Sequence, residues 1–168
     1  MDAGGWHGLA GENILRQVRE RDEVSRAPEL DRGTVDALAE VFDFVFADQA
    51  IPPQMKFVIG RLQIPVLKAA MIDRDFFLTD DHPARRLVDT LAAASVQWAP
   101  EKGEQDPLYQ RIESTVMRVL NEFEDDLALF SELLQEFTEF LFEDSTFKSS
   151  VDCTDSWLFF FYFFIHFN

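Results

Sequence analysis

The apolar positions between Leu108 and Phe142 have the clearest periodicity in the chain. They recur every seven residues in two rows that together alternate in steps of three and four: Tyr109, Val116, Phe123, Phe130 and Phe137, and Leu120, Leu127, Leu134 and Leu141. This spacing is typical of a helix that buries one stripe of its surface. Because the stretch contains no proline or glycine, it predicts one long amphipathic helix.

Four shorter helices are predicted before the long one, at residues 35–47, 53–63, 66–72 and 83–98. Thr34 is expected to cap the first of them. Pro65 is expected to end the second, so that the third begins after it. His82 stands directly before Pro83 and is expected to cap the fourth. No segment reads as a convincing strand. The predicted fold class is all-α, an antiparallel array or bundle of about five helices with one long C-terminal amphipathic helix.

Three regions are expected along the chain. Residues 1–33 are predicted to be a flexible leader that contains a marginal helix, because Pro28 and Gly33 break the sequence before the first core helix. Residues 34–147 form the helical domain. Residues 148–168 form a Phe-rich tail whose composition favours a disrupted or out-of-frame end over a native apolar tail.

The charge is strongly negative and unevenly distributed. The formal net charge of −16 argues against nucleic acid as the main partner. Residues 101–147 carry 13 acids against three basic residues, whereas residues 56–86 carry six basic residues against four acids. The acidic part has two interpretations, a solvated helix face or a docking surface for a basic partner.

A cytoplasmic location is expected. The chain has one cysteine, Cys153, which excludes an internal disulfide and fits a reducing compartment. The first residues lack the basic and apolar regions of a secretory signal. The apolar run from Trp157 to Phe167 would cover about 16 Å as a helix, too little for a hydrocarbon core of about 30 Å, so no membrane span is expected.

No catalytic residue, metal site or cofactor site is predicted. The three histidines stand in different segments, and no second cysteine or metal-binding histidine motif accompanies them. Glu122, Glu124, Asp125 and Asp126 lack the loop and glycine of a calcium site. These four acids are interpreted as a solvated face.

The best candidates for binding are four basic residues: Arg61, Lys68, Arg85 and Arg86. Both consecutive arginines fall in the first turns of a predicted helix, where exposed N–H groups also favour an anion. Pairing with acids inside the protein is the alternative. In one such arrangement Arg86 meets Asp43 or Asp73 while Arg85 faces solvent.

Two sequence blocks resemble a known family. They are Ile59-Gly60-Arg61-Leu62-Gln63-Ile64-Pro65-Val66-Leu67-Lys68 and His82-Pro83-Ala84-Arg85-Arg86-Leu87, with Asp73 and Phe76-Phe77 between them. Residues 30–147 resemble a bacterial family of large proteins, domain of unknown function number sixteen thirty-one. The resemblance implies a cytoplasmic, mostly helical segment of a longer chain.

Proteins of this family are often named thymidine phosphorylase automatically, and the residues of this chain give that name no support. A phosphorylase needs a glycine-rich phosphate cradle, whereas residues 34–147 hold only Gly60 and Gly103. An enzyme is therefore the third-ranked hypothesis for the chain.

Two functional hypotheses rank above it. The first is a helical scaffold or protein-interaction module of a larger bacterial cytoplasmic protein. Its partner would be another protein or the rest of the full-length chain, and the long helix or the Phe-rich tail could mediate self-association. The alternative is a regulatory domain that binds an anionic or phosphate-containing small molecule near Arg61, Arg85 and Arg86.

Overall fold

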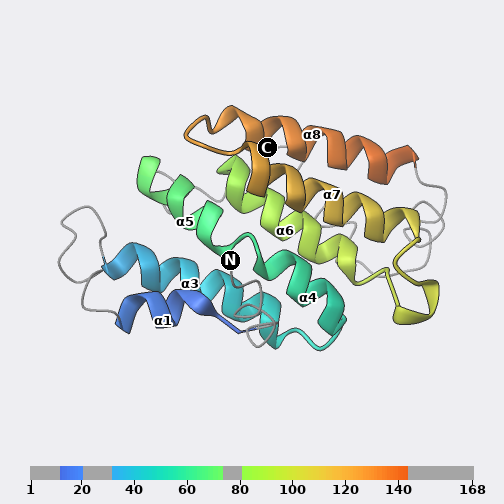
Figure 1. Cartoon of the computed structure of the whole chain (residues 1–168), viewed down its shortest axis with the longest axis horizontal. Helices are drawn as coiled ribbons and strands as arrows, with labels where there is room; N and C mark the ends of the chain where they lie inside the picture. The colour runs from blue at the N-terminus through green and yellow to red at the C-terminus, as the bar shows by residue number, and fades with distance from the viewer. Residues whose placement is uncertain (1–11, 21–31, 74–80, 144–168) are drawn as a thin grey trace, which may run out of the picture.

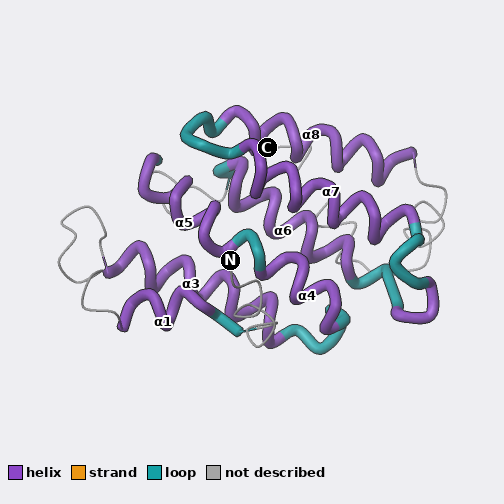
Figure 2. Tube along the Cα trace, viewed as in Figure 1, coloured by secondary structure: helices purple, strands orange, loops and turns teal. Residues whose placement is uncertain are grey.

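The computed structural model shows an all-helical protein (Figures 1 and 2). The structure describes residues 12–20, 32–73 and 81–143, and within them every regular element is a helix. The elements are α1 (Ile14–Glu20), α3 (Arg32–Ala47), α4 (Pro53–Gly60), α5 (Gln63–Ile72), α6 (Pro83–Ser95), the 3₁₀ turn η3 (Pro100–Lys102), α7 (Pro107–Glu122) and α8 (Ala128–Glu143). The all-α prediction is confirmed.

The helices lie side by side, with their axes roughly along the long axis of the molecule (Figure 1). Helices α1 and α3 pack against each other at one edge, and α8 packs on α6 and α7 at the other. Helices α4, α5 and α6 lie between these edges. One core runs through all the layers, with Leu15 of α1, Phe42 of α3, Ile59 of α4, Leu91 of α6 and Phe130 of α8 all fully buried. Burial of each such side chain contributes about 1.5–3 kcal/mol.

The prediction of one long helix from Leu108 to Phe142 is wrong. Helix α7 ends at Glu122, Phe123 has extended backbone with φ −76° and ψ 116°, and α8 starts only at Ala128. The acidic run before α8 explains the break: three consecutive acids repel one another, and Asp126 Oδ1 accepts the Ala128 N–H at 2.9 Å. A loop joins the two helices (Figure 2).

Helices α7 and α8 fold back on each other as a helical hairpin. The rings of Phe123 and Phe130 meet edge to face, with centroids 4.8 Å apart. Both Phe130 and Phe137 are fully buried. The seven-residue spacing survives because each helix keeps the period on its own side of the loop, and both apolar faces enter one core.

The break between α4 and α5 falls earlier than predicted. Proline was expected to separate the two helices at Pro65, but the turn is at Arg61–Leu62 and α5 begins at Gln63. Pro65 therefore lies in the first turn of α5, where a missing N–H breaks no hydrogen bond. Gly60 at the end of α4 allows close packing, because a Cβ there would lie 3.1 Å from Cζ of Phe46.

The predicted cap of α6 is confirmed. His82 is buried, and its Nδ1 accepts the Ala84 N–H at 3.1 Å. The other ring nitrogen, Nε2, lies 3.4 Å from Oδ2 of Asp73, so one side chain joins the end of α5 to the start of α6. The cap predicted at Thr34 is wrong, because α3 already begins at Arg32.

Helix α1 lies inside the segment that was predicted to hold a marginal helix. Its Leu15 is part of the common core, and Asn13 donates from Nδ2 to Ala39 O at 2.7 Å and to Asp43 Oδ1 at 2.8 Å. Arg16 forms an ion pair with Asp43. The division of the chain into leader, domain and tail stays a prediction, and the Phe-rich tail and the Phe76-Phe77 pair lie outside the described residues.

Candidate functional site

A line of exposed positions runs along α4 and α5. It consists of Phe57, Arg61, Ile64, Lys68 and Ile72, and we refer to these five residues as the α4–α5 stripe. Their spacing of three or four residues is that of neighbours on one helix face, carried across the short turn between α4 and α5. Figure 1 shows the two helices crossing the middle of the molecule nearly end to end.

The stripe is apolar at three of its five positions. Phe57 is 37% exposed, and Ile64 and Ile72 are each 46% exposed. They make up half of the six large exposed apolar residues in the described part of the chain. Single exposed apolar residues are ordinary, but a line of them on one face indicates a contact surface.

The same segment is free of acidic residues. No aspartate or glutamate occurs between Asp48 and Asp73, whereas Lys56, Arg61 and Lys68 all fall there. In a protein with a net charge of −16 this makes a local basic patch. Because salt screens charges beyond about 8 Å at physiological ionic strength, a molecule in contact with the stripe interacts mainly with the charges in its immediate surroundings.

The two cations of the stripe have no acidic partner among the described residues. Lys68 Nζ lies 5.6 Å from the centroid of the Phe123 ring, a cation–π contact that leaves the side chain exposed. The guanidinium of Arg61 makes no hydrogen bond or ion pair with any described residue. Burial raises the pKa of the Tyr109 phenol, and the charge of Arg61 opposes that increase, so Arg61 lies close to the start of α7.

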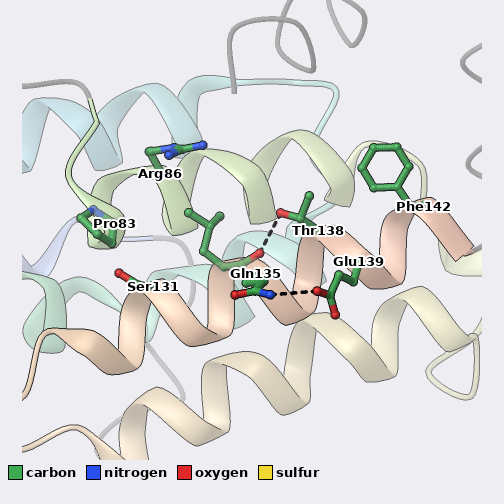
Figure 3. Close-up of a pocket in the computed structure, with 8 residues that line it drawn as sticks. Pro83, Arg86, Ser131, Gln135, Thr138, Glu139 and Phe142 are labelled. Atoms are coloured by element: carbon green, nitrogen blue, oxygen red, sulfur yellow. Dashed lines mark hydrogen bonds between the residues drawn. The ribbon is translucent and has the colours of Figure 1, made fainter. Parts of the chain in front are cut away.

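The other two predicted residues, Arg85 and Arg86, lie in the first turn of α6 and are half-buried. Both interact with neighbouring groups. Arg86 lines a shallow groove of about 410 Å³ between α6 and α8 (Figure 3). Asp43, one of the two acids that Arg86 was expected to meet, is bound by Arg16 and Asn13 instead.

The groove is lined by Pro83, Arg86, Ser131, Leu134, Gln135, Thr138, Glu139 and Phe142. Its polar groups on α8 are largely bonded to one another: Gln135 Nε2 donates to Glu139 Oε1 at 3.0 Å, and Thr138 Oγ1 donates to Leu134 O at 2.7 Å (Figure 3). Neither Arg61 nor Lys68 reaches it. The four predicted basic residues are therefore divided between the α4–α5 stripe and the start of α6.

On the acidic surface of α7 and α8 one arginine, Arg118, contacts three glutamates. Arg118 donates from Nη1 to Glu136 at 2.6 Å and from Nε to Glu122 at 3.1 Å, and its Nη2 lies 3.4 Å from Glu132. Glu122 is the main cause of the raised pKa of Arg118. Each side chain is at least one-third exposed, so the pairs stabilise the hairpin only modestly.

No metal site is formed by the residues that the structure describes. Glu122, Glu124, Asp125 and Asp126 are exposed around the α7–α8 loop, and no group of three or more His, Cys, Asp or Glu among the described residues is arranged to hold an ion. Across residues 12–20, 32–73 and 81–143, no helix combines the length and apolarity needed to cross a bilayer.

Residues 9–126 match the family described as "Protein of unknown function (DUF1631) 2nd domain". The chain belongs to this family. The match begins before α1 and ends in the α7–α8 loop, so it contains both sequence blocks that carry the resemblance and leaves α8 outside. No curated protein and no solved structure is similar to the chain. Membership of the DUF1631 family therefore assigns no activity to the chain.

The three apolar residues of the α4–α5 stripe were not predicted as site residues from the sequence. Met55, Val58 and Ile59 form the buried face of α4. The signal that remained was Phe57, Ile64 and Ile72, which recur at helical spacing outside the buried set and alternate with basic residues. A second signal was the absence of acids between residues 49 and 72.

Proposed function

We propose that this DUF1631 second domain is a helical protein-interaction module that docks an acidic amphipathic helix of a partner protein on the α4–α5 stripe. The proposal places it in a larger bacterial cytoplasmic protein, as the family resemblance implies, and assigns no catalytic step to it. The observation that carries the proposal is the stripe itself, in which exposed apolar and basic side chains alternate on an acid-free segment of an acidic protein.

Both kinds of side chain favour the same partner. Covering the exposed parts of Phe57, Ile64 and Ile72 would contribute about 1 kcal/mol each, which is a useful but modest apolar term. Arg61 and Lys68 would add specificity and a faster association with a negatively charged segment. A helix with apolar anchors three or four residues apart and acids beside them matches the spacing of the stripe.

A narrow partner fits this surface better than an anionic membrane. A membrane is flat and would approach a wide face of a molecule whose net charge is −16. A single helix is about 10 Å wide and would meet only the stripe and its immediate surroundings. The local positive charge therefore favours the binding of a single acidic helix. For an anionic bilayer, the net negative charge of the protein outweighs it.

Site-specific photo-crosslinking in cells that contain the protein tests this proposal. A photoreactive residue replaces Ile64 in one variant and Val96, which is 40% exposed at the end of α6, in a matched control. We expect the first variant alone to crosslink to an acidic helical segment, and the added substitution Lys68→Glu to remove the product. The same products at both positions, or products with no acidic segment, would overturn the proposal. Crosslinks to a second copy of the chain would indicate self-association instead.

A second candidate function is supported by the groove between α6 and α8. Its volume of about 410 Å³ lies within the range of small-molecule sites, and Arg86 at its edge belongs to the first turn of a helix. An anionic ligand with a phosphate group would suit that end. Thermal shift with phosphate and nucleotides tests this candidate. We expect stabilisation that Arg86→Gln removes and Arg61→Gln retains, and no shift with any of these ligands would exclude it.

A further inference from the structure

Helix α8 has the sequence pattern of a helix that binds in a groove. Its five buried residues are Phe130, Leu133, Leu134, Phe137 and Leu141. Counted from Phe130 they occupy positions i, i+3, i+4, i+7 and i+11, which is the anchor spacing of amphipathic helices that dock on apolar surfaces of other proteins. The other positions include four glutamates and no basic residue, together with the partly exposed apolar residues Leu129, Phe140 and Phe142.

The surface beneath α8 is formed by α6 and α7. Helix α8 packs against both α6 and α7, and Figure 1 shows α7 beside it. Two arginines of α7 hold it from the flank: Arg118 binds Glu132 and Glu136, and the guanidinium of Arg111 lies 4.9 Å from the centroid of the Phe140 ring. The surface formed by α6 and α7 therefore offers apolar contacts to the apolar face of α8, and two arginines lie beside its acidic face.

The connection between α7 and α8 is short and contributes little to the packing beyond Phe123 and Leu127. Glu124, Asp125 and Asp126 are exposed, and α8 begins with its own cap at Asp126. The family match ends at residue 126, within this connection. Helix α8 thus follows the family domain as a separately capped helix, and the α6–α7 surface belongs to the family domain without it.

We infer that the α6–α7 surface is a helix-docking surface of the family domain, and that α8 is its tethered occupant. A helix with the α8 pattern would then bind there from a separate molecule once the tether is cut. In the intact chain the short tether holds α8 at an effective concentration in the millimolar range, so α8 excludes competitors. This inference does not depend on the α4–α5 stripe, which lies on other helices.

The experiment uses the full chain with a protease recognition sequence inserted between Glu124 and Asp125. After cleavage under native conditions, a fluorescent peptide of residues 126–143 is added and its uptake is measured by anisotropy. We expect the two pieces to stay associated and the peptide to exchange into the cleaved chain. Uptake by the uncleaved chain should be at least about 100-fold weaker, because tethered α8 competes.

Two variants of the peptide make the test specific. Phe137→Ala, which removes a fully buried anchor, should weaken uptake by at least about 100-fold. Glu143→Ala, at an exposed position at the end of the same helix, should change it by less than about threefold. Aggregation of the cleaved chain that excess peptide does not reverse would overturn the inference, since α8 would then be integral to folding. Equal uptake by cleaved and uncleaved chains, or equal losses for the two variants, would overturn it as well.

Discussion

The α4–α5 stripe and helix α8 are built from the same kinds of side chain and end up in opposite situations. Each presents apolar residues at helical spacing with charges of one sign beside them. The apolar face of α8 lies on α6 and α7, and two of its four glutamates, Glu132 and Glu136, meet Arg118. The stripe faces solvent, and its Arg61 and Lys68 meet no acid among the described residues.

The difference shows which apolar helix face is still exposed to solvent. An amphipathic helix is stable in water when another surface covers its apolar face and meets its charges. For α8 both conditions are fulfilled inside the chain. For the stripe neither is, although acidic side chains are abundant elsewhere in the protein. The open face is basic and acidic side chains lie elsewhere, so we expect an acidic helix of another molecule to bind this face.

The largest effect on stability is expected in the core between α7 and α8. Phe130→Ala should lower the free energy of unfolding by about 3–5 kcal/mol, because the side chain is fully buried. Phe123→Ala should cost clearly less, since Phe123 is half-buried at the loop. Urea denaturation of both variants checks this. Equal losses would mean that the loop is packed as tightly as the helix.

The next effect concerns the cap that joins α5 to α6. His82→Ala removes the acceptor of the Ala84 N–H, and it should cost about 1–2 kcal/mol. His82→Asn should recover much of this loss, because asparagine is a good capping residue. Urea denaturation at pH 7 measures both, and an Asn variant as unstable as the Ala variant would show that packing, not capping, is the role of His82.

A smaller effect is expected where α1 docks on α3. Burial raises the pKa of Asp43, but hydrogen bonds from Arg16 and Asn13 outweigh it, and the net shift is downward. A carboxylate with a lowered pKa stabilises the fold above its unfolded pKa of about 4, and that contribution is lost as the pH falls through the folded value. Because Asp43 is well exposed, Asp43→Asn should cost no more than about 1 kcal/mol at pH 7.

The pH series of this variant sharpens the test. The gap in unfolding free energy between the wild-type protein and Asp43→Asn should close between about pH 4 and the lower folded pKa. A gap that stays constant down to pH 2 would show that the charge of Asp43 does not hold α1.

The smallest effect on stability is expected on the stripe. Ile64→Asp and Lys68→Glu should each change the free energy of unfolding by less than about 0.5 kcal/mol, because both positions are exposed. Leu67→Ala, on the buried face of the same helix, should cost about 2–5 kcal/mol and serves as the control. A large loss at Ile64 would mean that the stripe is structural.

The two helix breaks show which features of the fold can be predicted from the sequence. The residues that form the core faces of α4, α6, α7 and α8 follow from the 3.6-residue period, because burial enforces it locally. The α4–α5 break was placed too late, since proline is tolerated in a first turn and Pro65 sits in one. The α7–α8 break carries neither proline nor glycine, and the heptad spacing continues through it.

The candidate site was predictable only in part. Arg61 and Lys68 were identified from charge alone, and both proved to share one face. Arg85 and Arg86 were grouped with them because they are basic and lie at a helix start, yet Arg86 borders a different groove. Which exposed residues lie together depends on how the helices pack, and the spacing of residues along the chain does not show that packing.

The most direct test of helix docking on the α4–α5 stripe is an NMR titration of the ¹⁵N-labelled protein with a synthetic acidic amphipathic peptide. The peptide carries leucines at i, i+4, i+7 and i+11 and glutamates beside them. The control is a matched peptide in which each glutamate is replaced by lysine. We expect chemical-shift changes centred on residues 54–72 with the acidic peptide alone, and these changes should decrease as the salt concentration rises from about 50 to about 500 mM. No shifts at millimolar acidic peptide, or shifts centred on Arg86 and the α6–α8 groove, would contradict it.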